Sequence, residues 1–546
     1  MAAHANLSLV MEGLGARAAA AARLERALWL EPRHAMLWFN RGNLHSDVGS
    51  YRRALALDPA FAGAWLNLGV GLHGLGALGA AALMATRALA LGAVAQALNN
   101  LANARRDQGY IAEALALYGR ALAHAPFYAD AERNRLAARL YVEDDEAAAA
   151  ARAFVARHGG GAARLNARTD PEPERRLRVG LLSSDLGDHP VGRNLAAFVR
   201  HRDAGALFLC AYETGGRQEQ ASLWFRGRVD LWREVARLDD AAIAALIRAD
   251  AIDVLLVLAG RFDRNRPLVA SYRAAPVQVA LHDGGPSGMG EGGAICAWIT
   301  DRWLHPQGET SGGDRLVRLP VFYSFPKPDR LPAAWRPAAD GTIRLGSFSN
   351  PAKLSPPCLA AWARVLEALP QARLVLKYRG WYGDEAVRAR IAAWLPAAAA
   401  AGRVDFVAAA EDAEAHLSRY GAIDLGLDPF PFSGATTSFE ALCSGVPVLS
   451  LAGRSAIART TTAILGPLGL DELIATSVDD YVHRAVALAR APERLRELRA
   501  EIPQRLERSG LLDARAQAAA LTAALRELWR EWTRSQKSEG QKPEGV

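Results

Sequence analysis

Residues 423–453 read IDLGLDPFPFSGATTSFEALCSGVPVLSLAG and predict a strand, a turn, a helix and a second strand in close succession. The apolar run 423–427 is short enough for a parallel strand buried on both faces, and the prolines and glycine that follow end it. The segment from Thr437 to Glu440 has the pattern of a capping box, in which both side chains accept backbone N–H groups at a helix start. Gly445 would end that helix. A helix that begins at the carboxyl end of a parallel strand suits a phosphate, so this stretch favours a nucleotide diphosphate as ligand.

The composition indicates a globular protein of several domains. A chain of 546 residues is too long for one hydrophobic core, so we expect roughly three or four domains. No apolar run reaches the ~18 residues of a membrane span. The first residues lack the features of a secretory signal, and the four cysteines lie far apart. We therefore expect a cytoplasmic protein with free thiols, no metal site and no membrane partner. The net charge of +7 comes without a dense basic run, so nucleic acid is not an expected partner either.

Two short patterns repeat near the N-terminus. WFNRG at 38–42 recurs as WLNLG at 65–69 and, more weakly, as LNNL at 98–101. A second pattern, Arg-Ala-Leu, starts at residues 26, 53, 87 and 120, with offsets of 27, 34 and 33. Helix pairs that repeat every 34 residues are typical of tetratricopeptide repeats, which predicts an α-helical superhelix. The 27-residue unit lacks about two helical turns, so we expect a distorted or partly absent second helix near residues 49–53.

Asn40, Asn67 and Asn100 occupy equivalent positions in these repeats. Spaced amides on the concave face of a superhelix could bind the backbone of an acceptor peptide, because each amide offers a donor and an acceptor. The alternative is that asparagine merely suits this position of the repeat.

Two sets of buried strands separated by helical segments follow the repeats. Each set predicts a Rossmann-like α/β lobe, and a pair of such lobes favours a ligand in the cleft between the carboxyl ends of their strands. The predicted boundaries are repeats at 1–135, a helical linker at 136–176, an N-terminal lobe at 177–335, a nucleotide-binding C-terminal lobe at 336–510, a C-terminal helix at 511–534 and a disordered tail at 535–546.

Four motifs in these lobes, taken together, point to one family. They are DLGDHPVG at 185–192, FSNPAKL at 348–354, HLSRY at 416–420 and LDPFPFSGATT at 427–437. In this order they resemble the O-GlcNAc transferase family, glycosyltransferase family 41, in which tetratricopeptide repeats precede a two-lobed GT-B transferase. The resemblance implies an inverting, metal-independent transfer of a sugar, usually N-acetylglucosamine, from UDP to Ser or Thr hydroxyls of proteins. The sequence contains no Asp-x-Asp pair, which metal-dependent sugar transferases use to hold a divalent ion.

The resemblance also implies roles for individual residues. Without a metal, the charge of the leaving UDP must be met by fixed donors, and Lys353 and a helix N-terminus can supply them. The residues expected around the nucleotide sugar are Asn350, Lys353, His416, Arg419, Gly434, Ala435, Thr436, Thr437 and Glu440. Ordinary alternatives stand beside these roles: an exposed lysine at 353, a turn asparagine at 350, surface residues at 416 and 419, and a capping glutamate at 440.

His189 precedes Pro190 in the loop after the first strand of the N-terminal lobe, which predicts a place at the interlobe cleft. It could accept the proton of the acceptor hydroxyl, orient the substrate, or only bond the local backbone. His282 and Asp283 lie in the loop at 282–288, which the resemblance places toward the acceptor and the sugar.

This loop, Ala435 and Val257 depart from the family's usual residues. The departures leave two alternatives open: a UDP-glucose-using or Asn-directed protein glycosyltransferase, and a catalytically degenerate tetratricopeptide scaffold.

Overall fold

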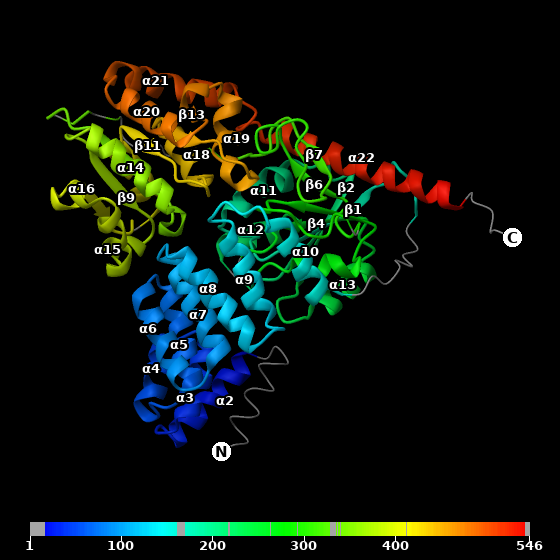
Figure 1. Ribbon diagram of the computed structural model, residues 1–546. Helices are drawn as coiled ribbons and strands as arrows, with labels where there is room; N and C mark the ends of the chain where they lie inside the picture. Colours follow the sequence, from blue (N-terminus) through cyan, green and yellow to red (C-terminus); the bar gives the residue numbers. More distant parts are fainter. Residues whose placement is uncertain are drawn as a thin grey trace.

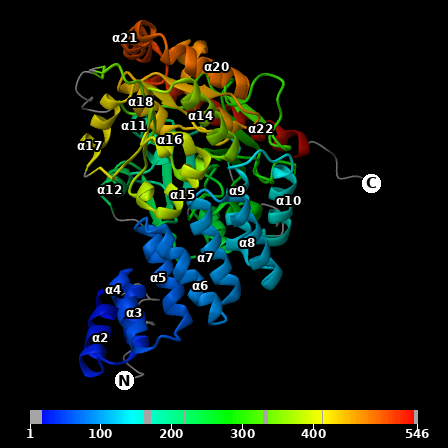
Figure 2. The same cartoon turned by 60° about the vertical axis from the view of Figure 1, so that its left-hand side comes forward.

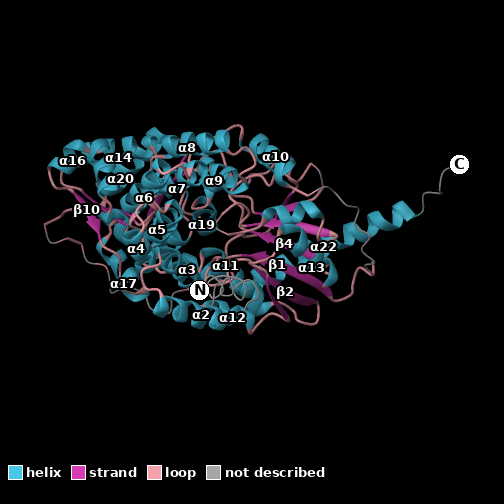
Figure 3. Ribbon diagram, turned by 90° about the horizontal axis from the view of Figure 1, so that it is seen from below, coloured by secondary structure: helices cyan, strands magenta, loops and turns pink. Residues whose placement is uncertain are grey.

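The computed structural model describes residues 17–160, 170–216, 219–262, 264–291, 293–327, 335, 337–338, 340–410 and 412–540. It confirms a helical superhelix followed by two Rossmann-like lobes (Figure 1). In this view the repeats lie below, the N-terminal lobe to the right and the C-terminal lobe to the upper left. Seen from below, the two sheets are separate and each is flanked by helices (Figure 3).

Antiparallel helix pairs make up the N-terminal region. Its helices are α2 (Arg17–Leu30), α3 (Ala35–His45), α4 (Val48–Leu57), α5 (Ala62–Gly74), α6 (Leu78–Ala90), α7 (Val94–Asp107), α8 (Ile111–His124), α9 (Ala129–Arg139) and α10 (Ala147–His158). Figure 2 shows them stacked from the protruding first helices toward the two lobes.

The repeated tryptophan and glycine each have a packing role. The indole Nε1 of Trp38 donates to the carbonyl of Pro32 at 2.8 Å, and that of Trp65 donates to Pro59 at 2.9 Å. A Cβ on Gly42 would lie 2.5 Å from the ring of Tyr51 on the second helix of the pair. Glycine is therefore needed where the two helices of this repeat approach most closely.

The 27-residue unit was predicted to have a distorted or partly absent second helix: the helix is not distorted, but it is shorter than the second helices of the next two repeats, with 10 residues in α4 against 13 in α6 and 14 in α8. Helix α4 is intact, with 10 residues, and Asp47 caps it by accepting from the N–H groups of Gly49 and Ser50. Its partner α3 is also short, with 11 residues against 13 in α5. The missing length is therefore shared by both helices of the unit. Asp47 gives the shorter second helix a regular, capped start.

The N-terminal lobe contains a parallel sheet of seven strands in the order β3-β2-β1-β4-β5-β6-β7. The strands are β1 (Leu177–Ser183), β2 (Leu207–Glu213), β3 (Leu231–Glu234), β4 (Val254–Leu258), β5 (Val277–Leu281), β6 (Ala297–Thr300) and β7 (Leu316–Arg318). Helices α11 (Pro190–His201), α12 (Gln220–Arg226) and α13 (Asp240–Ala249) connect the first four strands. Strands β4 and β5 are buried throughout, as parallel strands between two layers should be.

The C-terminal lobe contains a parallel sheet of six strands in the order β10-β9-β8-β11-β12-β13. The strands are β8 (Arg344–Ser347), β9 (Arg373–Lys377), β10 (Val404–Val407), β11 (Leu425–Leu427), β12 (Val448–Leu451) and β13 (Ile474–Ala475). Its helices are α14 (Pro356–Ala368), α15 (Glu385–Trp394), α16 (Pro396–Ala400), α17 (Ala413–Ser418), α18 (Thr436–Cys443), α19 (Thr462–Leu465), α20 (Val478–Ala489) and α21 (Pro492–Arg508).

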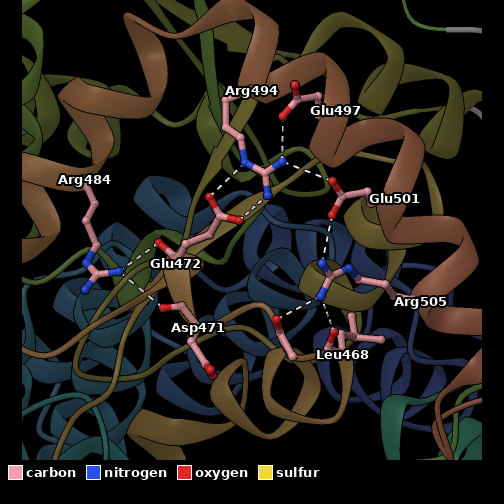
Figure 4. A network of polar contacts seen from close by, with 9 residues as sticks. Leu468, Asp471, Glu472, Arg484, Arg494, Glu497, Glu501 and Arg505 are labelled. Atoms are coloured by element: carbon pink, nitrogen blue, oxygen red, sulfur yellow. Dashed lines mark hydrogen bonds and ion pairs between the residues drawn. The ribbon is translucent and has the colours of Figure 1, made fainter.

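An ion network joins the last helices of this lobe (Figure 4). Arg494 pairs with Glu472, with Glu497 at 2.8 Å and with Glu501 at 3.1 Å, and Glu501 also pairs with Arg505 at 2.9 Å. These hydrogen bonds to carboxylates raise the pKa of the Arg494 guanidinium. A network that shares charges in this way holds α21 against the loop before β13 more firmly than isolated surface pairs would.

The final helix, α22 (Ala514–Gly540), returns from the C-terminal lobe and packs on α11 of the N-terminal lobe. Trp529 is fully buried, stacks on Trp532 at 4.8 Å and donates to the carbonyl of Glu172 at 3.2 Å. The helix runs to Gly540, so the prediction of disorder from residue 535 is wrong for 535–540. Residues 541–546 lie outside the described part of the chain.

Candidate nucleotide-sugar site

The order of strands in the C-terminal lobe places a crevice between β8 and β11. From β8 the chain proceeds to β9 and β10 on one side, and from β11 to β12 and β13 on the other. Ligands of open parallel sheets bind at such a switch point, outside the carboxyl ends of the strands. A small cavity of about 30 Å³ lies there, and its lining includes Phe348, Ser349, Tyr420, Asp428 and Thr437.

Asp428 holds the turn between β11 and α18. Its buried carboxylate accepts the N–H of Gly434 at 2.7 Å through Oδ1 and the hydroxyl of Ser450 at 2.6 Å through Oδ2. Burial raises the pKa of Asp428, while these bonds and nearby Lys353 oppose the rise. The turn that contains Gly434 is therefore fixed from inside the lobe.

Lys353 lies beside this same turn, as the sequence predicted. Its Nζ donates to the carbonyl of Ser433 at 2.8 Å and lies 4.1 Å from the centre of the Phe432 ring. Burial lowers the pKa of Lys353 to about 8, with Asp428 opposing the shift. The alternative of an exposed surface lysine is wrong. The residue that its ammonium contacts, Ser433, lies three positions before Thr436.

The predicted capping box does not form. Helix α18 begins at Thr436 rather than after Thr437, and its N-cap residue is Ala435, which offers no side-chain acceptor. Glu440 is thus the fifth helical residue, too far along to reach the first N–H groups. The hydroxyl of Thr436 is buried and has no hydrogen-bond partner among the described residues. The helix therefore begins with a positive end that has no side-chain cap, three residues after the Ser433 carbonyl that Lys353 contacts.

Glu440 instead belongs to a polar cluster that joins the two lobes. Its Oε2 lies 3.0 Å from His416 Nε2 and 3.4 Å from the Tyr420 hydroxyl, and its Oε1 lies 3.4 Å from Nη1 of Arg193 on α11. Lys377, at the end of β9, contacts the other ring nitrogen of His416. Burial lowers the pKa of Lys377, and Glu440 opposes this. Sequence reasoning missed Lys377 and Arg193, although Lys377 stands at the carboxyl end of a predicted strand.

Two other predicted donor-site residues differ in their surroundings. Asn350 accepts the N–H of Ala352 at 2.9 Å and so caps the 3-10 turn η2 (Pro351–Lys353). This matches the alternative role given to Asn350, that of an ordinary turn residue. The bond fixes the backbone of Ala352, which directly precedes Lys353. Arg419 is exposed, one turn after His416.

His189 lies at the carboxyl end of β1 and is the N-cap of α11. Its Nδ1 accepts the N–H of Val191 at 3.4 Å and lies 3.7 Å from Oδ2 of the buried Asp185. Asp185 in turn accepts from the amide of Asn265 at 2.7 Å. The contact with its own helix orients the ring of His189, and the buried carboxylate of Asp185 lies nearby.

His282 lies close to His189, but Asp283 does not face the cleft. Burial, with the nearby His189, lowers the pKa of His282 to about 3, so its ring stays neutral, packed at 4.9 Å from Phe322. The carboxylate of Asp283 is 7% exposed, lies 3.5 Å from Arg261 and lines an inner cavity. The expectation that Asp283 meets the acceptor fails because its side chain turns into the lobe.

The repeat asparagines are not equivalent. Asn40 is buried, whereas Asn67 donates to Asn43 at 2.7 Å and Asn100 accepts from Asn99 at 3.3 Å. Asn67 and Asn43 belong to neighbouring helix pairs, which favours a structural role for this amide.

In the ranges given above, no group of three or more His, Cys, Asp or Glu side chains is arranged to hold a metal ion. Within the same residues, no helix is both long and apolar enough to cross a membrane.

Comparison with known proteins agrees with this architecture. The family model described as Glycosyl transferase family 41 matches residues 337–521. The probable UDP-N-acetylglucosamine–peptide N-acetylglucosaminyltransferase SPINDLY of Hordeum vulgare is 31% identical over 412 residues, covering 73% of this chain and 43% of that protein. The SPINDLY protein of Arabidopsis thaliana is 32% identical over 374 residues, covering 67% and 41%. The chain thus spans less than half the length of these curated relatives.

A solved structure matches the whole architecture. A mutant of the O-GlcNAc transferase of Thermobaculum terrenum superposes with a TM-score of 0.86 at 31% identity, covering 94% of this chain and 99% of that chain. By its identity to these relatives over two thirds or more of its length, this chain belongs to the O-GlcNAc transferase family, glycosyltransferase family 41.

Proposed function

We propose that the protein is an inverting, metal-independent glycosyltransferase that moves a sugar, N-acetylglucosamine in the first instance, from UDP to Ser or Thr hydroxyls of proteins. One observation carries the proposal: the Lys353 ammonium donates to the carbonyl of Ser433, three residues before α18 begins without a side-chain cap at Thr436, whose buried hydroxyl has no partner among the described residues. A cation close in space to a helix N-terminus that has no side-chain cap suits a diphosphate.

The rest of the nucleotide fits the neighbouring cluster. A uridine placed along the β8–β11 crevice would bring its ribose hydroxyls to Glu440 and its base to His416. Because Glu440 pairs with Arg193 of the other lobe in this structure, the ribose would share or replace that contact. Such an exchange would link donor binding to the distance between the lobes.

Transfer requires the acceptor hydroxyl to attack the anomeric carbon from the face opposite the diphosphate. The bond between that carbon and the phosphate oxygen breaks as the new C–O bond forms, which inverts the configuration. UDP leaves with the bonding electron pair, whose charge Lys353 and the α18 N-terminus stabilise. The hydroxyl proton must pass to a base, for which His189 on the facing lobe is the candidate. Because its Nδ1 accepts the Val191 N–H in this structure, Nε2 can take the proton only after Nδ1 has released Val191 and become protonated toward Asp185, whose Oδ2 lies 3.7 Å away.

Acceptor proteins would enter between the repeats and the lobes, and we place the enzyme in the cytoplasm without nucleic acid or membrane partners. A different donor sugar or an Asn acceptor is the second candidate, favoured by the 282–288 loop, in which Asp283 turns inward.

Donor-consumption and transfer assays with UDP-GlcNAc and UDP-glucose test the proposal. The expected result is turnover of UDP-GlcNAc that is lost in Lys353→Met. Faster turnover of UDP-glucose would favour the second candidate. Background turnover of both donors by the wild-type protein would contradict catalysis and leave the scaffold alternative.

A further inference from the structure

Arg390 lies where the repeats meet the C-terminal lobe. It belongs to α15, which faces helices α6 to α8 in Figure 1. Its Nε donates to the carbonyl of Gln108, at the end of α7, at 3.0 Å. Arg390 is 7% exposed, so its guanidinium is a buried part of the junction.

The other two nitrogens of this guanidinium hold the turn that carries Lys353. Nη2 donates to the carbonyl of Pro351 at 2.9 Å, and Nη1 donates to that of Leu354 at 2.8 Å. These carbonyls lie on either side of Lys353, whose own Nζ reaches Ser433 in the turn before α18. One side chain therefore connects the repeats, the lysine turn and the candidate diphosphate site.

The junction is built around this guanidinium. A Cβ on Gly109 would lie 2.3 Å from Nη2 of Arg390, and Gly109 has a φ of +89°, so glycine suits both the backbone and the close approach. Burial lowers the pKa of Arg390. No carboxylate of the described residues pairs with it, and its three nitrogens are all directed at backbone carbonyls. A planar guanidinium fork suits this arrangement, whereas an ammonium group cannot span the three carbonyls.

Further contacts fix the same junction. Asp384, the N-cap of α15, accepts the N–H of Gly79 at 2.6 Å and the side-chain amide of Gln108 at 3.1 Å. The hydroxyl of Tyr110 donates to the carbonyl of Ala386 at 3.2 Å. The repeats therefore dock on the helix that presents Arg390, and α7 also packs directly against η2.

We propose that Arg390 is a positioning residue for the donor site, through which the docked repeats fix the Asn350–Leu354 turn and hold Lys353 in place to bind the diphosphate. This rests on the proposed function, because it concerns the same nucleotide site. The repeats then form part of the donor site as well as a surface for acceptor proteins. A partner that displaces the α7–α8 turn would weaken UDP binding.

The test is calorimetric titration of the full-length protein with UDP, combined with thermal unfolding. Arg390→Met is the main variant. Arg403→Met is the matched control, because Arg403 also donates to three carbonyls, those of Leu366, Leu369 and Ala372, but lies at the amino end of β10, away from the site. Both variants leave carbonyls without their donor, so both should lower the melting temperature.

The expected result is a loss of UDP affinity of about tenfold in Arg390→Met, with none in Arg403→Met. Arg390→Lys should recover part of the affinity, since an ammonium group can still reach one of the carbonyls. In steady-state transfer, the KM for the donor should rise while the KM for the acceptor stays unchanged.

Gln108→Ala weakens the same junction from the repeats, with no substitution in the C-terminal lobe. Loss of its bond to Asp384 should weaken UDP binding about threefold. If Arg390→Met does not fold, the UDP affinity of Gln108→Ala tests whether the docked repeats support the donor site. Equal UDP affinity in the wild type, Arg390→Met and Gln108→Ala would overturn the coupling. A wild-type protein that does not bind UDP would overturn the proposed function itself, so the two failures can be told apart.

Discussion

Each lobe has its own parallel sheet with a switch point, and the helices that carry the candidate site residues begin differently: α11 follows β1 in the N-terminal lobe, and α18 follows β11 in the C-terminal lobe. In the N-terminal lobe, His189 caps α11 with its own ring and Pro190 follows at the first helical position. In the C-terminal lobe, Ala435 gives α18 no side-chain cap, and within the described part of the chain the buried Thr436 hydroxyl has no partner. Under the proposed function, the capped end of α11 places the candidate base His189, and the uncapped end of α18 takes the diphosphate. Proton transfer and charge stabilisation would then be divided between the two lobes.

The largest effect is expected from Lys353→Met, which removes the cation beside the uncapped end. Turnover should fall by about a thousandfold, because fixed donors to a leaving group contribute on this scale. UDP binding should weaken as well, and Lys353→Arg should restore part of both. Rates of UDP-GlcNAc consumption and calorimetric Kd values measure this. Unchanged turnover in Lys353→Met would show that Lys353, beside the N-terminus of α18, does not stabilise the negative charge of the leaving UDP.

His189→Ala should lower kcat by about a hundredfold, the scale of general acid–base catalysis. Because His189 belongs to the other lobe, the Kd for UDP should stay near that of the wild type. Asn265→Ala, which removes one hydrogen bond to Asp185, should lower kcat less. An equal loss of UDP affinity and kcat in His189→Ala would remove the proposed division of roles.

Ala435→Asp would give α18, in the C-terminal lobe, a side-chain cap at its N-terminus. The carboxylate should stabilise α18 by about 1 kcal/mol and raise the melting temperature. It should also weaken UDP binding more than tenfold, because it occupies the N–H groups and repels the diphosphate. Ala435→Gly is the control and should leave the affinity near that of the wild type. Tight UDP binding by Ala435→Asp would show that the nucleotide does not use this helix end.

The smallest effect is a pH dependence of UDP binding. Burial lowers the pKa of Lys353 from 10.5 to about 8, so the empty protein loses this charge as the pH rises through 8. The Kd for UDP should then rise by up to about tenfold per pH unit above 8. Between pH 8 and 10.5 the unfolded chain binds the extra proton, so this group's contribution to stability increases with pH. Lys353→Met should remove the slope, and a wild-type slope that persists in the variant would contradict the assignment.

Strand periodicity and motif order were enough to predict both lobes and the lysine beside the turn. The capping box was predicted wrongly because local pattern alone could not show that Asp428 fixes Gly434 and starts the helix at Thr436. The neighbours of Glu440 come from α11 and β9, which are far away in the sequence. Only the packed lobes reveal such contacts.

In the repeats, too, the sequence pattern predicted the architecture but not the individual side-chain contacts. Their period predicted the superhelix, whereas the capping by Asp47 that completes the short unit depends on one side chain. The contact between Gln108 and Arg390 joins residues 282 positions apart, and no local pattern marks it.

The most direct test is an experimental structure of the protein with UDP bound. Diphosphate oxygens are expected at about 2.7–3.2 Å from Lys353 Nζ, the Thr436 hydroxyl and the first N–H groups of α18. A diphosphate bound at α11, or more than a hydrogen bond away from both Lys353 and Thr436, would contradict this expectation.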